Sequence, residues 1–279
     1  MRLLITWGIA VIAWGVSVTA KAELHLLPDK GPQTVFAGAA RKITVMWLNT
    51  GDQTINWDVR MRIYQSGFAT AVPLRQTDWK QLQVLPGQTV LESAQVEFPA
   101  VRASTEFLVQ WLGGTNRVLG VTKVRVYPNN LLKALASVSG ELNFGVFDPE
   151  NKIKGLLKAQ GIEFVDLEED DLNDFNGRLA IIGPFQTKEQ MPDDLAKQIA
   201  AMARKNVAVV WIQPPRLEND KLEPSFYSVQ KNETAVVIAQ PDLVTDLSDN
   251  PQSQLNLICL CRQAANPQAP TLPDLCLQP

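Results

Sequence analysis

The sequence predicts two domains, an all-β sandwich followed by an α/β domain with a doubly wound parallel sheet. Three observations lead to this fold class. Residues 24–128 contain one strand pattern after another, separated by turn residues and without a helical period. The pattern changes at Pro128, after which short apolar runs alternate with helical segments. Several of these runs are continuously apolar, which is typical of parallel strands buried on both faces.

The first 22 residues are expected to be a signal peptide. Arg2 precedes a long apolar run, and Ala20-Lys21-Ala22 has the small-x-small pattern that signal peptidase reads, so cleavage is expected after Ala22. An uncleaved membrane anchor is the alternative, because the apolar run approaches the length that spans a bilayer. After cleavage no transmembrane segment is expected. The sequence therefore predicts an exported bacterial protein, periplasmic or extracellular.

Residues 23–128 are expected to form the sandwich. In the clearest strand, 55–63, Ile, Trp, Val and Met alternate with Asn, Asp and two Arg, as in an antiparallel strand with one buried face. Asn, Gly and Pro mark turns at 49–52 and 86–87, and 113–116 reads as the turn of a closing hairpin. The other expected strands are 43–48, 82–85, 90–98, 107–112 and 118–127.

The tryptophans of this region are expected to differ in exposure. Trp47, Trp57 and Trp111 each occupy an apolar position of an alternating pattern, which favours a core role over a carbohydrate-binding platform. Trp79 lies between two charged residues outside the expected strands. We expect it to be exposed or to contact the second domain.

A linker is expected at 129–140, followed by the α/β domain at 141–265 and a Pro-rich tail at 266–279. Asp148-Pro149 has the form of a helix start, with a capping side chain before a proline in the first turn. The expected strands are 142–147, 164–167, 179–183, 207–212 and 235–239, and the other expected helices lie around 195–203 and from 250 to 265.

Each domain resembles a known group of proteins. The turns at 49–52 and 86–87 and the closing hairpin resemble the Ig-like modules of bacterial cell-surface proteins called CARDB, over residues 33–127; this implies adhesion, spacing or domain packing. The order of strand 179–183, helix and strand 207–212 resembles the class I glutamine amidotransferase-like superfamily over about 141–265, with a plain flavodoxin-like fold as the alternative. Catalytic members carry a Gly-x-Cys-x-Gly elbow and a downstream His. Since both are missing here, the resemblance implies the fold without the active site.

The residue inventory argues against several kinds of enzyme. The chain has one histidine, His25, and no cysteine before Cys259, so we expect no amidase, peptidase or esterase activity and assign no catalytic residue. Cys259 and Cys261 lie two apart on an expected helix. A disulfide from Cys276 in the tail to either of them is one interpretation, and free thiols are the alternative.

Charge and acid spacing limit the partners further. Cleavage after Ala22 removes Arg2 and Lys21, which leaves 24 basic and 29 acidic side chains and a net charge of −5. This argues against a nucleic-acid partner. The acidic residues at 166–174 lack the spacing and internal glycine of a calcium loop, so a solvated connection is expected there and no metal or cofactor is predicted.

A small polar ligand would lie at the carboxyl ends of the parallel strands, where Asp148, Gln186 and Gln213 are the candidate residues. Helix capping is the alternative role of Asp148. Two functions remain. The first is a non-catalytic envelope protein that binds or scaffolds another protein or a glycan. The second is a hydrolase that uses carboxylates alone, for which the sequence shows no clear facing pair.

Overall fold

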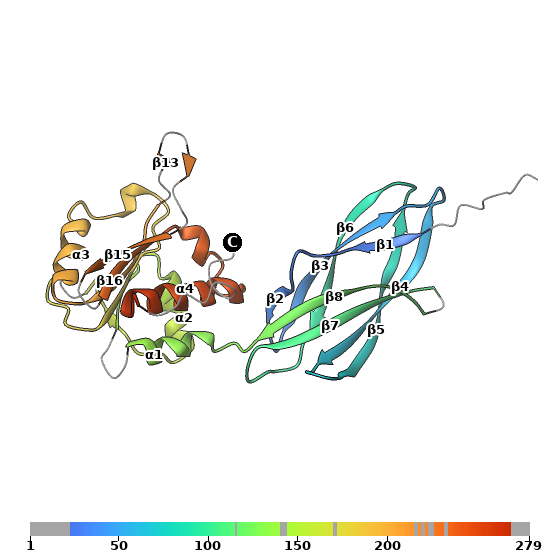
Figure 1. Cartoon of the computed structure of the whole chain (residues 1–279), viewed down its shortest axis with the longest axis horizontal. Helices are drawn as coiled ribbons and strands as arrows, with labels where there is room; N and C mark the ends of the chain where they lie inside the picture. Colours follow the sequence, from blue (N-terminus) through green and yellow to red (C-terminus); the bar gives the residue numbers. More distant parts are fainter. Residues whose placement is uncertain are drawn as a thin grey trace, which may run out of the picture.

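A computed structural model describes residues 23–114, 116–139, 144–169, 172–214, 217–218, 221–222, 226–231 and 234–268. The expected signal peptide, Cys276 and all of the tail after residue 268 lie outside these described residues. The chain folds into an all-β part, residues 24–127, and an α/β part, residues 131–265, as the sequence predicts at this level (Figure 1).

The β part contains eight strands in two sheets. One sheet has the strand order β2-β8-β7-β4-β5 and the other β1-β3-β6, and residues of both contribute to one buried core. The strands are β1 (Leu24–Leu27), β2 (Gln33–Phe36), β3 (Ala40–Asn49), β4 (Ile55–Ser66), β5 (Ala71–Val84), β6 (Thr89–Glu97), β7 (Thr105–Gly113) and β8 (Arg117–Tyr127).

The tryptophans form the centre of this core. Trp47 and Trp111 are fully buried and Trp57 packs against the same cluster, which confirms their core role. The expectation that Trp79 is exposed or reaches the second domain is wrong, because its ring lies 4.9 Å from that of Trp111 and 6.5 Å from that of Trp47. The cause is the length of β5, which extends through Trp79 and turns its side chain toward the core.

The α/β part is built on a six-stranded sheet with the order β10-β9-β11-β12-β16-β15. The first five strands are parallel, whereas β15 pairs antiparallel with β16 and was not predicted. The elements are η1 (Leu131–Lys133), α1 (Ala134–Ser139), β9 (Gly145–Phe147), α2 (Lys152–Ala159), β10 (Val165–Asp166), β11 (Leu179–Ile182), η2 (Lys188–Gln190), α3 (Leu195–Arg204), β12 (Ala208–Ile212), β13 (Leu217–Glu218), β14 (Lys221–Leu222), β15 (Phe226–Lys231), β16 (Thr234–Ala239), η3 (Pro241–Val244) and α4 (Pro251–Ala265).

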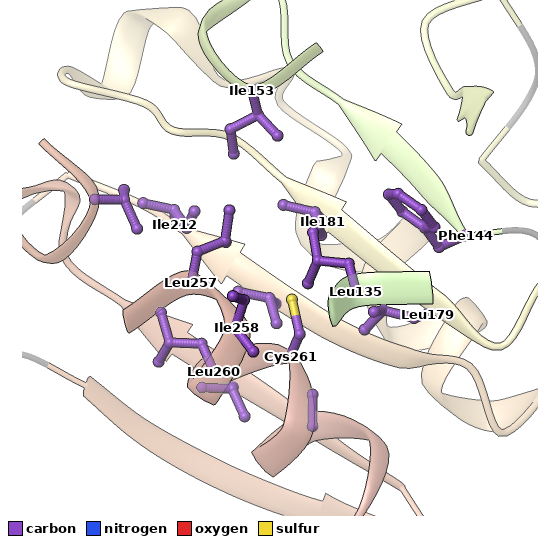
Figure 2. Close-up of a cluster of buried hydrophobic side chains, with 14 of the residues drawn as sticks. Leu135, Phe144, Ile153, Leu179, Ile181, Ile212, Leu257, Ile258, Leu260 and Cys261 are labelled. Atoms are coloured by element: carbon purple, nitrogen blue, oxygen red, sulfur yellow. The ribbon is translucent and has the colours of Figure 1, made fainter. Parts of the chain in front are cut away.

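Helices lie on both faces of this sheet. On one face α1, α2 and α4 pack over Ile181 and Ile212, with Leu257 of α4 at the centre of the cluster (Figure 2). On the other face α3 packs over Ile182. Side chains of adjacent residues in β11 thus enter different cores, which explains why this strand is apolar without alternation.

The segment expected to be a linker, 129–140, contains η1 and α1. Leu132 and Leu135 of this segment are 0% exposed and belong to the core of the α/β part (Figure 2). The two parts also contact each other directly. Arg41 Nη1 lies 2.8 Å from Asp249 Oδ1, and the Asn129 side chain donates a 3.0 Å hydrogen bond to the carbonyl of Ala37.

Candidate functional site

The carboxyl ends of β9 and β11 form the place where a ligand is expected. From β9 the chain goes outward to β10 and then returns to β11 on the other side, so the strand order reverses between β9 and β11. Asp148 follows β9 and Gln186 follows β11. The loops that carry them are joined, because Gln190 accepts from the Gln186 N–H at 2.6 Å and donates to the Glu150 carboxylate.

Gly183, directly after β11, is packed closely against the backbone of the two neighbouring strand ends. Its φ is +96°, and its N–H donates to the carbonyl of Phe147 at 2.8 Å. A Cβ at this position would lie 2.3 Å from the carbonyl oxygen of Ile212, which is far inside van der Waals contact. Only glycine therefore fits this position without moving the backbone.

Asp148 is fully buried and caps α2. Its Oδ2 accepts hydrogen bonds from the N–H groups of Ile153 at 2.6 Å and Lys154 at 3.0 Å, and its own N–H donates to Glu168 Oε1 at 2.9 Å. Among the described residues Oδ1 has no hydrogen-bond partner. Asp148 thus binds N–H groups in the first turn of α2 through one of its oxygens, as a capping side chain does. The predicted helix start is wrong, because α2 begins at Lys152 with Asn151 as its N-cap, and Pro149 therefore lies before the helix.

A buried lysine neutralises the two acids beside Asp148. The Lys154 side chain is 4% exposed, and its Nζ lies 2.6 Å from Glu168 Oε1 and 3.1 Å from Asp166 Oδ2. Burial alone would lower the pKa of Lys154, but the two carboxylates outweigh burial and raise it. Burial likewise acts to raise the pKa of Asp166, and the Glu168 N–H and the Lys154 ammonium outweigh this effect and lower it.

These shifts limit the chemistry of the cluster. A protonated Lys154 has no lone pair for nucleophilic attack, and an Asp166 with a lowered pKa is a poor proton donor. The ion pairs instead attach α2 to Asp166 at the end of β10 and to Glu168 just after it. In the described part of the chain no group of three or more His, Cys, Asp or Glu side chains is arranged to hold a metal ion.

The three predicted ligand residues lie at the same edge of the sheet in different environments. Asp148 is buried, Gln186 is exposed, and Gln213 at the end of β12 is 3% exposed with its N–H bonded to the carbonyl of Ala239 at 3.0 Å. Their role in ligand binding stays a prediction. His25 lies on β1 of the other part, with Nε2 3.6 Å from Glu23 Oε2.

The cluster around Lys154 was not predicted. The acids at 166–174 were interpreted as a solvated connection, yet Asp166 and Glu168 bind Lys154; Asp170 and Asp171 lie outside the described residues. The sequence holds no local signal for this cluster. Lys154 lies about 100° around the helix from Ile153, and its burial comes from the packing of α2 beside Asp166 and Glu168.

The cysteines are in different states. Cys259 is disulfide-bonded, and Cys261 is a free thiol with 0% exposure. Of the two cysteines of α4, only Cys259 is therefore able to form the predicted bridge to the tail; Cys276 lies outside the described residues. Also within the described residues, no helix is long and apolar enough to cross a membrane.

Comparison with known proteins assigns no family. No family model and no curated protein sequence matches the chain. Among solved structures, an alkylpurine DNA glycosylase from Pseudomonas fluorescens matches at 14% identity and a TM-score of 0.30, over 38% of this chain and 31% of that one. A β-glucosidase from Listeria innocua matches at 14% identity and a TM-score of 0.28, over 38% of this chain and 16% of that one. The chain thus spans less than a third of the length of either protein.

The search against family models corrects the resemblances drawn from the sequence. The assignment to a CARDB-type Ig-like module followed by a glutamine amidotransferase-like domain is wrong, because no family model, including those of these two families, matches the chain. The patterns behind the two resemblances are turns between alternating strands and a strand-helix-strand order. Both follow from general backbone physics and recur in unrelated proteins.

Proposed function

We propose that this chain is a non-catalytic exported protein of the bacterial envelope, in which a β-sandwich domain and a doubly wound α/β domain together present a binding platform for another protein. The proposal rests on the observation that acidic side chains at the edge of the parallel sheet are already paired within the chain. Asp166 and Glu168 are both bound to Lys154, and Asp148 caps α2. The acids that a carboxylate-dependent hydrolase would use are thus engaged in holding the fold together.

Two further observations support export. The apolar N-terminus ends in Ala20-Lys21-Ala22, and Cys259 is disulfide-bonded, as is common in oxidising compartments outside the cytosol. Mass spectrometry of the chain recovered from the periplasm should give a mature protein that starts at Glu23. Recovery with residues 1–22 intact would instead indicate an anchored protein.

Catalysis is tested on the purified mature chain with chromogenic glycoside, ester and amide substrates. We expect no turnover above that of a heat-denatured sample. The matched variants Asp148→Asn and Asp249→Asn show whether any turnover depends on the edge of the parallel sheet or on another position in the α/β part. Turnover that disappears in Asp148→Asn and persists in Asp249→Asn would overturn the non-catalytic assignment.

A further inference from the structure

The β part is open along one side, between β5 and β6. These are edge strands of the larger and the smaller sheet. Near one end Lys80 of β5 and Glu92 of β6 form an ion pair 2.5 Å long that closes the gap between the sheets. Toward the other end all eight residues from Ala71 to Asp78 are exposed, although they belong to a continuous strand. This half of β5 therefore contributes no buried side chain to the core.

A pocket of about 320 Å³ lies in this opening, which we call the seam pocket. Its floor includes core residues, since Ile63 is 1% and Phe98 0% exposed. The lining residues are Ile63, Leu74, Arg75, Glu97, Phe98 and Pro99. A mostly apolar pocket with one cationic side chain at its wall fits an apolar side chain next to a carboxylate.

Exposed apolar side chains gather beside the pocket. Phe68, at the turn between β4 and β5, is completely exposed, Val72 is 55% exposed and Leu74 is 43% exposed. Large apolar side chains grouped in one exposed segment mark interaction surfaces more often than single ones do. The exposed first half of β5 joins the turn to the seam pocket, and we treat the two together as the candidate surface.

The charge of this segment is opposite to that of the chain. Residues 59–77 contain three arginines and no acid, whereas the whole chain has a net charge of −3. Within the described residues none of the three is bonded to a carboxylate. Arg60 donates to the carbonyl of Gly114 at 3.0 Å, Arg62 to the side-chain oxygen of Gln76 at 2.8 Å, and Arg75 to the main-chain carbonyl of Glu97 at 2.8 Å. The Glu97 carboxylate is the only acid that lines the pocket.

The geometry favours side-chain contacts over strand addition. Pro73 lies within β5 and lacks an N–H, and the pairing of β4 with β5 shifts register at two places. Both features interrupt the edge that an added strand would need. A membrane is also a poor occupant, because stable attachment takes a lipid chain or a cluster of about four or more basic residues.

We propose that the seam pocket and the adjoining turn bind an acidic, apolar segment of another protein, which places a large apolar side chain against Leu74 and a carboxylate against Arg75. This rests on the proposed function and names the chemistry of its partner. The neutral hydrogen-bond partner of Arg75 leaves its charge available for such a contact.

The test uses the full mature chain and two synthetic peptides with the same central leucine, one flanked by glutamates and the other by lysines. Fluorescence polarisation should show binding of the glutamate peptide only. Leu74→Asp and Arg75→Glu should each weaken this binding about tenfold. Leu91→Asp and Lys42→Glu make matched changes at exposed positions of the smaller sheet and should leave it unchanged.

Four outcomes would overturn the proposal: no binding of the glutamate peptide, equal binding of both peptides, binding that the seam variants leave intact, or stronger binding to phosphatidylglycerol vesicles that Arg75→Glu abolishes. The last would assign the surface to a membrane. Circular dichroism of each variant shows whether it is folded. If the glutamate peptide does not bind and the catalytic assay shows no turnover, the seam-pocket proposal is wrong, whereas the proposal of a non-catalytic binding platform is not contradicted.

Discussion

Replacing Lys154 with methionine tests whether the chain's own cation holds the acids at the sheet edge. The Lys154 side chain is 4% exposed, and those of Asp166 and Glu168 are 23% and 30% exposed. Removing one partner of a fully buried ion pair costs about 3–5 kcal/mol. Because water reaches both acids, we expect the free energy of unfolding to fall by about 1–3 kcal/mol. Urea unfolding followed by circular dichroism measures this change.

The pH dependence of the same variant has a defined sign. The Lys154 ammonium helps to hold the pKa of Asp166 below its ordinary value of 3.8, against the opposing effect of burial. A carboxyl whose pKa is lower in the folded state contributes stability above its unfolded pKa and loses it as the pH falls through its folded pKa. The stability difference between wild type and Lys154→Met should therefore narrow as the pH falls below about 4.

Lys152→Met is the matched control on the same helix. Lys152 is 45% exposed and pairs with Glu150, so its loss should change the free energy of unfolding by no more than about 0.5 kcal/mol. Adding Asp166→Asn and Glu168→Gln to Lys154→Met removes the unpaired charges and should restore part of the stability. Equal losses in the two lysine variants, or a difference that stays constant down to low pH, would refute the reasoning.

Gly183→Ala should lower the free energy of unfolding by about 2–4 kcal/mol, because Gly183 has a positive φ and a Cβ there would clash with the backbone. Gly155 lies at an open position in a helix, so Gly155→Ala should raise the free energy of unfolding by up to about 1 kcal/mol. Thermal melts that rank the two variants in the opposite order would contradict this. Thr122→Val removes the acceptor 2.9 Å from the buried indole N–H of Trp111 and should cost about 1–3 kcal/mol in a urea titration. Burial raises the pKa of the Cys261 thiol, so mass spectrometry should show it unmodified by a thiol reagent until the chain unfolds; rapid labelling of the native chain would refute this.

Strong local patterns predicted most of the fold. The alternation at 55–63 and the Pro251 helix start both correspond to real elements, β4 and α4. The first half of β5 was missed because its residues are exposed on both faces and have no alternation to detect. β15 was missed for a related reason, since it is an edge strand that pairs with the sheet on one side only.

The candidate site was harder to predict than the fold. Asp148 was recognised because a helix cap is a local signal within a few residues. The link of Lys154 to Glu168 spans 14 residues and depends on how β10 lies against β9, which no local pattern encodes. The seam pocket depends on the divergence of two sheets and involves residues from Ile63 to Pro99. Sites of this kind become visible only once the tertiary arrangement is known.

The two candidate surfaces differ in what their charged side chains are bonded to. At the edge of the parallel sheet Lys154 lies between two carboxylates, so a ligand would have to break these ion pairs before using any of the three groups. At the seam the Arg75 side chain, among the described residues, is hydrogen-bonded to a neutral carbonyl, and the exposed Leu74 lines the same pocket. An incoming carboxylate would add a charge-assisted contact there without displacing an internal one. The charged groups at the α/β edge are therefore engaged in holding the fold together, and within the proposed two-domain platform we place the partner contact on the β part.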